Sequence, residues 1–242
     1  MDLWVPSAAH DAGTALGAAL EAAHLLGEPP CEPLRTAGLG PEIEGERARA
    51  ALEARGLSPV EGDAIETAAE RLAGGGVIGW AVGRLEYGPR ALGFRSIVAH
   101  PGHSGVQDRV NAIKTRQRWR PFGPSVLEEH ASAWFVDSDF GPFMTFTADV
   151  VPAQRERVSG VVHEDGSTRP QAVDQDTNPP WRALIEAFHQ RSGVPMVLNT
   201  SFNGRDEAIV ATEEQAVESA LRLGLDGLVL GSCYVDLPGS AR

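Results

Sequence analysis

The sequence is poor in several residue types that often carry function. It has a single lysine among 242 residues, and its two cysteines, Cys31 and Cys233, are too far apart to form a metal-binding pair motif. Two free thiols are typical of a reducing compartment. No run of about 18 apolar residues is present, which argues against a membrane-spanning helix. The N-terminal stretch MDLWVPSAAHDAG has no basic region followed by an apolar one, so we predict a cytoplasmic protein without a secretory signal or a membrane partner.

Several motifs of nucleotide-binding and hydrolytic sites are also absent. The sequence contains no GxxxxGK[ST] loop, no GxGxxG after a strand, no HExxH and no nucleophile elbow. A nucleotide bound by this chain would therefore be held by a fold other than the P-loop or the dinucleotide-binding fold.

Positive charge is concentrated in one part of an acidic chain. The formal net charge is -12, which argues against a nucleic-acid partner. Residues 84–120 nevertheless carry eight basic and two acidic side chains, a local charge of +6. Such an island on an acidic body favours a pocket for a small anion. The alternative is a solvated helix face between Arg109 and Arg120, to which Arg116 and Arg118 would belong.

Helical and strand patterns alternate along the chain, which predicts an α/β or α+β fold. Asp11 is the expected N-cap of the first helix, and Thr212 and Gln215 have the spacing of a capping box. Proline and glycine are frequent in residues 27–42, which indicates a linker or a wrapped arm. We predict helices at 12–25, 63–75, 104–118, 181–193 and 211–224, and strands at 76–83, 194–203 and 225–235.

The stretch EYGPRALGFRS is the first candidate for chemistry. Pro89 and the neighbouring glycines stiffen and tighten its backbone, which fixes Arg90 and Arg95 in place. Guanidinium groups bind phosphate and carboxylate oxygens through two parallel hydrogen bonds. The alternative is an ordinary turn with two surface arginines.

The stretch KTRQRWRPFGPS contains the only lysine. Lys114, Arg116 and Arg120 lie close together in sequence, and RPFGP predicts an extended exit from the segment. An ammonium group places a compact charge beside a phosphate. A single lysine retained in an arginine-rich chain therefore indicates a specific role for Lys114, chance being the alternative.

Two further stretches carry polar side chains toward a predicted site. His163 and Arg169 flank a turn built by EDGS, which predicts a β-hairpin with polar side chains on its stem, although a lone histidine is often structural. The apolar segment VPMVL runs into a polar loop, and polar side chains at a strand end are typical of ligand binding, with capping of the loop as the alternative. The side chains of this loop are Asn199, Thr200, Ser201 and Asn203.

Together these stretches resemble the C-terminal region of the O-carbamoyltransferases, which modify antibiotics, nodulation factors and related natural products. The similarity covers residues 60–235 and includes GRLEYGPRALGFRSIVAHP, NAIKTRQRWRPFGPSVL, HEDGSTRPQAV and GVPMVLNTSFNGRDEAIV. The resemblance implies a YrdC-like twisted mixed sheet with flanking helices, preceded by an N-terminal helical arm. It implies a domain that forms carbamoyl adenylate from carbamoyl phosphate and ATP with Mg²⁺. A second, kinase-like domain of the family passes the carbamoyl group to an acceptor hydroxyl of a small molecule.

The family motifs map onto particular positions of this chain. Arg90 and Arg95 match the arginines of GPRALGxRS, and Lys114 matches the lysine of KxRxxxRPF. Arg169 matches the arginine of DGTxRxQ, although Ser167 and Thr168 replace the usual threonine and small residue. The resemblance implies catalytic roles for Lys114 and Arg169. It implies contacts with ATP or carbamoyl phosphate for Arg90, Arg95, Lys114, Arg116, Arg120, His163, Arg169, Asn199, Thr200, Ser201 and Asn203.

The N-terminal residues resemble the last segment of the family's kinase-like domain. Asp11 matches an aspartate that binds a divalent metal in the family, iron being one candidate, whereas His10 replaces a glycine and is either a bystander or an added ligand. The expected organisation is a terminal segment of the kinase-like domain at 1–27, a linker at 28–59 and the YrdC-like domain at 60–242. We expect a separate large subunit to supply the remaining metal ligands and the acceptor pocket, with a fragment of a longer protein as the alternative.

Two other functional classes are compatible with these residues. One is a noncatalytic subunit that binds a nucleotide and regulates its partner. The other is a tRNA-directed relative that makes threonylcarbamoyl adenylate, since YrdC-like folds also perform that reaction. The acidic charge and the GPRALG motif argue against the second class.

Overall fold

A seven-stranded mixed sheet forms the centre of the computed structural model, which describes residues 5–239. The strand order is β11-β10-β2-β4-β9-β5-β8. The β10–β2 and β5–β8 pairs are parallel and the other pairs are antiparallel. The strands are β2 (Val77–Ala81), β4 (Arg95–Ala99), β5 (Gly123–Leu127), β8 (Gln171–Val173), β9 (Met196–Ser201), β10 (Gly227–Leu230) and β11 (Cys233–Asp236).

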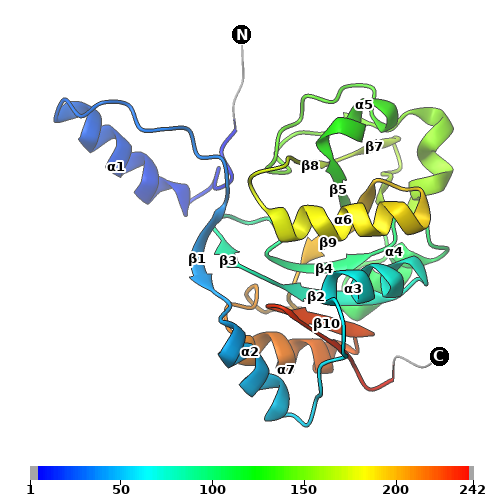
Figure 1. Cartoon of the computed structure of the whole chain (residues 1–242). Helices are drawn as coiled ribbons and strands as arrows, with labels where there is room; N and C mark the ends of the chain where they lie inside the picture. The colour runs from blue at the N-terminus through cyan, green and yellow to red at the C-terminus, as the bar shows by residue number, and fades with distance from the viewer. Residues whose placement is uncertain (1–4, 240–242) are drawn as a thin grey trace.

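Helices cover both faces of this sheet (Figure 1). Helices α3 (Ala64–Ala73) and α6 (Pro179–Ser192) pack against each other, while α2 (Gly45–Glu53) packs against α7 (Glu213–Leu223). Every residue of β2, β4 and β5 is buried, as expected for strands covered on both sides. The predicted α/β class with a mixed sheet and flanking helices is confirmed.

Side-chain caps fix where the main helices begin. The Asp63 carboxylate accepts hydrogen bonds from the first turn of α3, and the Asn178 side chain accepts one from the first turn of α6. The predicted capping box of Thr212 and Gln215 is present at the start of α7, and Gly224 ends that helix with a positive φ of 65°.

Some predicted boundaries differ from the observed ones. The helix expected at 104–118 is α4 (Val106–Ile113), because Lys114 ends it and Thr115 has a φ of +50°. The strand expected at 225–235 is the hairpin of β10 and β11, which turns at Gly231. The stretch after EDGS does not form the predicted hairpin, because a helical segment precedes the turn and β7 (Ser167–Thr168) pairs with β6 (Ala148–Asp149) instead.

The expected linker 28–59 contains regular structure. Strand β1 (Gly38–Glu42) pairs with β3 (Arg84–Glu86), and α2 lies within the same segment. The remaining short elements are η1 (Glu128–His130), α5 (Ala131–Trp134) and η2 (Pro152–Val161).

The N-terminal arm extends away from the sheet domain (Figure 1). Helix α1 (Gly13–Leu25) has no buried residue, and its N-cap is Ala12, not the expected Asp11. The Tyr87 hydroxyl donates a hydrogen bond to the Ala12 carbonyl, which joins the start of the arm to the domain. Residues 1–4 of the segment 1–27, and 240–242 of the segment 60–242, lie outside the described residues. None of the described helices is long and apolar enough to cross a bilayer.

Candidate functional site

Lys114 lies at the end of α4 with its ammonium group directed at the end of β9. Only 5% of the residue is exposed. Its Nζ donates to the main-chain carbonyls of Ser201 (2.5 Å) and Asn203 (2.8 Å) and to Asn203 Oδ1 (2.9 Å). These acceptors are neutral, so they orient the ammonium without cancelling its charge. Burial, and then the positive Arg116 and Arg120, lower the pKa of Lys114 to about 7.

Arg116 and Arg120 follow Lys114 on the loop between α4 and β5. The Arg116 Nε donates to Asn111 Oδ1, and its guanidinium carbon lies 4.3 Å from the centre of the Phe122 ring. Burial, and then the charge of Arg120, lower the pKa of Arg116 to about 10. The positive φ of Thr115 turns the chain between Lys114 and Arg116, a strained conformation for a β-branched residue.

These groups surround a cavity of about 440 Å³. No carboxylate lies within ion-pair distance of Lys114, Arg116 or Arg120 among the described residues. The lining also contains Asp206, which pairs with Arg205 at 3.5 Å, and the remaining excess of basic groups attracts an anion. We call this the Lys114 cavity; its lining includes Lys114, Arg116, Arg120, Ser201, Asn203 and Arg205, the last of which the sequence reasoning missed.

Arg169 and Arg90 form a second group of like charge. Burial, and then the nearby Arg90, lower the pKa of Arg169 to about 10. Burial also lowers the pKa of His163, whose Nδ1 lies 3.3 Å from the Ser167 hydroxyl. Two guanidinium groups close enough to disfavour each other's charge are stabilised by an anion between or beside them. This supports an anion-binding role for Arg90 and Arg169, which stays a prediction.

The loop that carries Arg90 is held by buried side chains on both sides. Its amides at Leu92, Phe94 and Arg95 all donate to Glu86 Oε1, at 2.9–3.0 Å. Burial raises the pKa of Glu86, although these hydrogen bonds oppose the shift. Three successive carbonyls of the loop, those of residues 91–93, accept hydrogen bonds from buried side chains, namely Asn199, Gln171, Asn178 and Trp80. The sequence reasoning missed Glu86, Gln171 and Asn178.

Arg95, five residues after Arg90, is placed differently. The residue is 0% exposed, and its guanidinium donates to the main-chain carbonyls of Pro41, Val82, Gly83 and Phe94. A side chain engaged in this way joins β1 to the end of β2 and is not available to a phosphate. The structure therefore favours a structural role for Arg95 over the predicted anion contact.

The polar residues of β9 and of the loop that follows it have different surroundings. The side chain of Asn199 is buried and donates to the Ala91 carbonyl and to Ser125 Oγ, so it supports the loop of Arg90. Ser201 and Asn203 line the Lys114 cavity, and the Ser201 hydroxyl donates to Asn203 Oδ1 at 2.6 Å. Thr200 lies on the opposite face of the strand from Asn199 and Ser201, because side chains alternate along a strand.

Asp11, the predicted metal ligand, is exposed in the turn before α1. The neighbouring His10 Nδ1 accepts a hydrogen bond from the Ala12 amide. Within residues 5–239 no group of three or more histidine, cysteine, aspartate or glutamate side chains is arranged to hold a metal. Asp11 is therefore a single possible ligand, and the described part of the chain does not make a metal site by itself.

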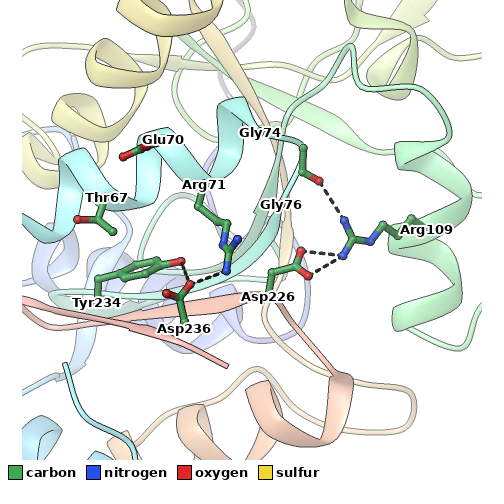
Figure 2. Close-up of a pocket in the computed structure, with 10 residues that line it drawn as sticks. Thr67, Glu70, Arg71, Gly74, Gly76, Arg109, Asp226, Tyr234 and Asp236 are labelled. Atoms are coloured by element: carbon green, nitrogen blue, oxygen red, sulfur yellow. Dashed lines mark hydrogen bonds and ion pairs between the residues drawn. The ribbon is translucent and has the colours of Figure 1, made fainter. Parts of the chain in front are cut away.

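Another hollow, of about 480 Å³, lies beside the end of α3 (Figure 2). Arg109 donates to both carboxylate oxygens of Asp226, at 2.7 and 2.8 Å, and Arg71 pairs with Asp236 at 2.6 Å. The arginines of this hollow are thus neutralised by aspartates, and none of the predicted site residues lines it. Because Arg118 also pairs with Asp108, the basic residues of 84–120 left for an anion are Arg90, Lys114, Arg116 and Arg120, together with the solvent-exposed Arg84.

The fold of this chain resembles that of a solved structure. The chain resembles full-length HypF in its phosphate- and nucleotide-bound form, with a TM-score of 0.53 and 14% identity over 75% of this chain and 22% of that chain. The likeness is one of fold alone, and it confirms the predicted YrdC-like architecture. The sequence relatives are more specific.

Residues 69–236 match the family model for the carbamoyltransferase C-terminus. The chain is 45% identical to nodulation protein NolNO of Sinorhizobium fredii, over 97% of this chain and 36% of that protein. It is 44% identical to nodulation protein NolO of Bradyrhizobium diazoefficiens (97% and 44%) and 32% identical to the 3'-hydroxymethylcephem-O-carbamoyltransferase of Amycolatopsis lactamdurans (96% and 43%). The chain belongs to the carbamoyltransferase family, as predicted. It spans less than half the length of these relatives.

Proposed function

We propose that this chain is the adenylating component of an ATP-dependent O-carbamoyltransferase. It would convert carbamoyl phosphate and ATP into carbamoyl adenylate, from which the carbamoyl group passes to a hydroxyl of a small natural product. Family membership supports carbamoyl transfer.

The observation that carries the proposal is the Lys114 cavity. ATP and carbamoyl phosphate are both strongly anionic, and the cavity presents the amino group of Lys114 and the guanidinium groups of Arg116 and Arg120, none of which forms an ion pair with a described carboxylate. Groups held in place before the substrate arrives stabilise developing charge without a cost of reorganisation. The hydrogen bonds of Lys114 to the end of β9, and those of Asn111 to the loop, provide that arrangement.

The proposed first half-reaction has two steps. Water releases phosphate from carbamoyl phosphate and leaves carbamate. A carboxylate oxygen of carbamate then forms a bond to the α-phosphorus of ATP, while the bond between the α-phosphorus and the bridging oxygen of pyrophosphate breaks. Negative charge grows on pyrophosphate and on the oxygens of the α-phosphorus. Lys114 and Arg169 are the proposed stabilisers of this charge, and Mg²⁺ would accompany the nucleotide.

The second half-reaction would need more protein than this chain supplies. The acceptor hydroxyl attacks the carbamoyl carbon, AMP leaves, and the hydroxyl proton is lost. We propose that a large subunit, or the remainder of a longer protein, provides the acceptor pocket and completes a divalent metal site with Asp11. Two features support this: the chain spans less than half of its relatives, and α1 has no buried residue of its own.

Pyrophosphate release tests the proposal. The purified chain is incubated with ATP, Mg²⁺ and carbamoyl phosphate, with and without the part of a relative such as NolO that lies outside the match to this chain. We expect pyrophosphate that depends on carbamoyl phosphate, and we expect Lys114→Ala and Arg169→Ala each to reduce its rate at least about 100-fold, the effect of removing one electrostatic group from such a site. Arg55→Ala, which removes an exposed arginine outside the site, is the matched control.

Each result distinguishes the proposal from its alternatives. Unchanged rates in both variants would show that the site lies elsewhere. Nucleotide binding without turnover, even with the partner part present, would favour a noncatalytic regulatory subunit. Turnover with bicarbonate and threonine in place of carbamoyl phosphate would favour the threonylcarbamoyl class.

A further inference from the structure

Residues 5–12 lie against the sheet domain before the exposed helix α1 begins. Ser7 is 3% exposed and Ala8 is 5% exposed, whereas α1 has no buried residue. The Tyr87 hydroxyl donates a hydrogen bond to the Ala12 carbonyl at the end of this stretch. We call residues 5–12 the docked segment, because they are held by the domain although the helix that follows them is not.

Gly88 makes a close approach to the docked segment from the loop of residues 87–94. A Cβ atom added at Gly88 would lie 2.4 Å from the Ser7 carbonyl oxygen, and Gly88 has a φ of +129°. Both observations require glycine at this position. The Thr145 hydroxyl adds a contact from another loop, since it donates to the Val5 carbonyl at 3.4 Å. The main chain of the docked segment therefore rests directly on the main chain of the loop.

The loop of residues 87–94 is held in two different ways along its length. Its second half is bound to the sheet, because Glu86 accepts hydrogen bonds from its amides and buried side chains donate to the carbonyls of residues 91–93. Among the described residues, the main-chain groups of residues 88–90 make no hydrogen bond. The first half of the loop is instead contacted by the docked segment, and Arg90 stands at the end of this half.

The position of Arg90 matters because its charge acts on Arg169. The two guanidinium groups are close enough for Arg90 to lower the pKa of Arg169, so a displacement of Arg90 changes the field that an anion meets there. We infer that residues 5–12 position Arg90 for its anion, because they fix the first half of the loop that carries it. Tyr87 and Gly88, which meet the docked segment, are then positioning residues. Such coupling is reciprocal, so an anion held by Arg90 also strengthens the docking. This inference rests on the anion-binding role proposed for Arg90.

Hydrogen exchange of the full chain measures the docking directly. The amides of His10 and Gly13 donate to the carbonyls of Ala8 and His10, at 2.7 and 2.8 Å, so their exchange is slow while this turn is held in place. We expect inorganic phosphate to slow exchange in residues 7–13 about 2- to 10-fold, the range that one hydrogen bond contributes, relative to chloride at the same ionic strength. Arg90→Ala should abolish this protection and should weaken phosphate binding in calorimetry.

Two glycines of α1 provide a matched pair of variants. A Cβ atom added at Gly13 would lie 2.1 Å from the Ala8 carbonyl oxygen, so Gly13→Ala forces the docked segment to shift without touching the loop of Arg90. The same methyl group at Gly17 meets nothing within 4 Å, so Gly17→Ala is the control and should match wild-type protein. We expect Gly13→Ala to lose the phosphate-dependent protection and to weaken phosphate binding about 2- to 10-fold. Tyr87→Phe, which removes only the hydroxyl, should behave in the same way.

The outcomes separate this inference from the proposed function. If phosphate leaves the exchange of residues 7–13 unchanged in wild-type protein while Arg90→Ala weakens phosphate binding, the positioning role is wrong and the anion site stands. Protection that persists in both Gly13→Ala and Tyr87→Phe would also overturn the positioning role. Phosphate affinity that does not change in Arg90→Ala would contradict the anion-binding role of Arg90, and with it that part of the proposed function.

Discussion

The low pKa of Lys114 predicts that nucleotide binding takes up a proton. At pH 8 a lysine with a pKa of about 7 is only about 10% protonated. A triphosphate in the Lys114 cavity would favour the ammonium form, and an anion near 4 Å at an effective dielectric constant of 20 contributes about 4 kcal/mol, or roughly 3 pKa units. The pKa in the complex would then lie near 10, and binding at pH 8 should take up about 0.9 proton per nucleotide.

Calorimetric titration in buffers of different ionisation enthalpy measures this uptake directly. The experiment is best done at pH 8, because phosphate groups with a pKa near 6 no longer titrate there. Between pH 7 and pH 9 we expect the affinity of wild-type protein to fall up to tenfold for each pH unit, since the ammonium must be restored on binding.

Two variants isolate the contribution of Lys114. Lys114→Met has no titrating group and should take up no proton, with weaker binding that does not depend on pH in this range. Lys114→Arg carries a charge at all relevant pH values and should bind without proton uptake. Uptake that is absent in wild-type protein, or that persists unchanged in Lys114→Met, would refute the reasoning.

Two further predictions concern the protein without ligand. Because the folded-state pKa of Lys114 lies below its unfolded value of 10.5, the unfolded chain binds more protons between these values and stability should rise with pH; from pH 7 to pH 9 the gain should be about 2 kcal/mol in urea unfolding, and it should disappear in Lys114→Met. Glu86→Ala removes the acceptor of three buried amides and should cost about 3–5 kcal/mol, whereas Glu86→Gln keeps an acceptor oxygen and should cost less. Equal losses in the two Glu86 variants would contradict the assigned role of the oxygen.

The local signals of the fold could be predicted from the sequence. The capping box at Thr212 and the apolar strands at Val77 and Met196 depend on near neighbours, so periodicity and spacing were sufficient. The early end of α4 could not be foreseen, because the Lys114 side chain beside Thr115 is held by the carbonyls of Ser201 and Asn203, 87 and 89 residues further along the chain.

In the candidate site, too, some features could be predicted from the sequence and others could not. The convergence of Lys114, Ser201 and Asn203 was expected from a polar strand end and a family resemblance. The sequence did not predict that the basic residues would have such different surroundings. Arg95 is enclosed by main-chain carbonyls that include that of Pro41, 54 residues earlier, and Arg109 is neutralised by Asp226, which lies 117 residues further along the chain. Such pairings belong to the tertiary structure and leave no mark on a local motif.

The loop of residues 87–94 is hydrogen-bonded on both sides, so the structural effect of a substitution elsewhere in the protein can reach it. Its amides are held from the β3 side by Glu86, and its carbonyls from the far side by Asn199 and Gln171, which belong to β9 and β8. A change in the spacing of those two strands would therefore be transmitted to Arg90 without any direct contact. Substitutions in the interior of the sheet could therefore reposition Arg90 while every basic side chain at the surface stays unchanged.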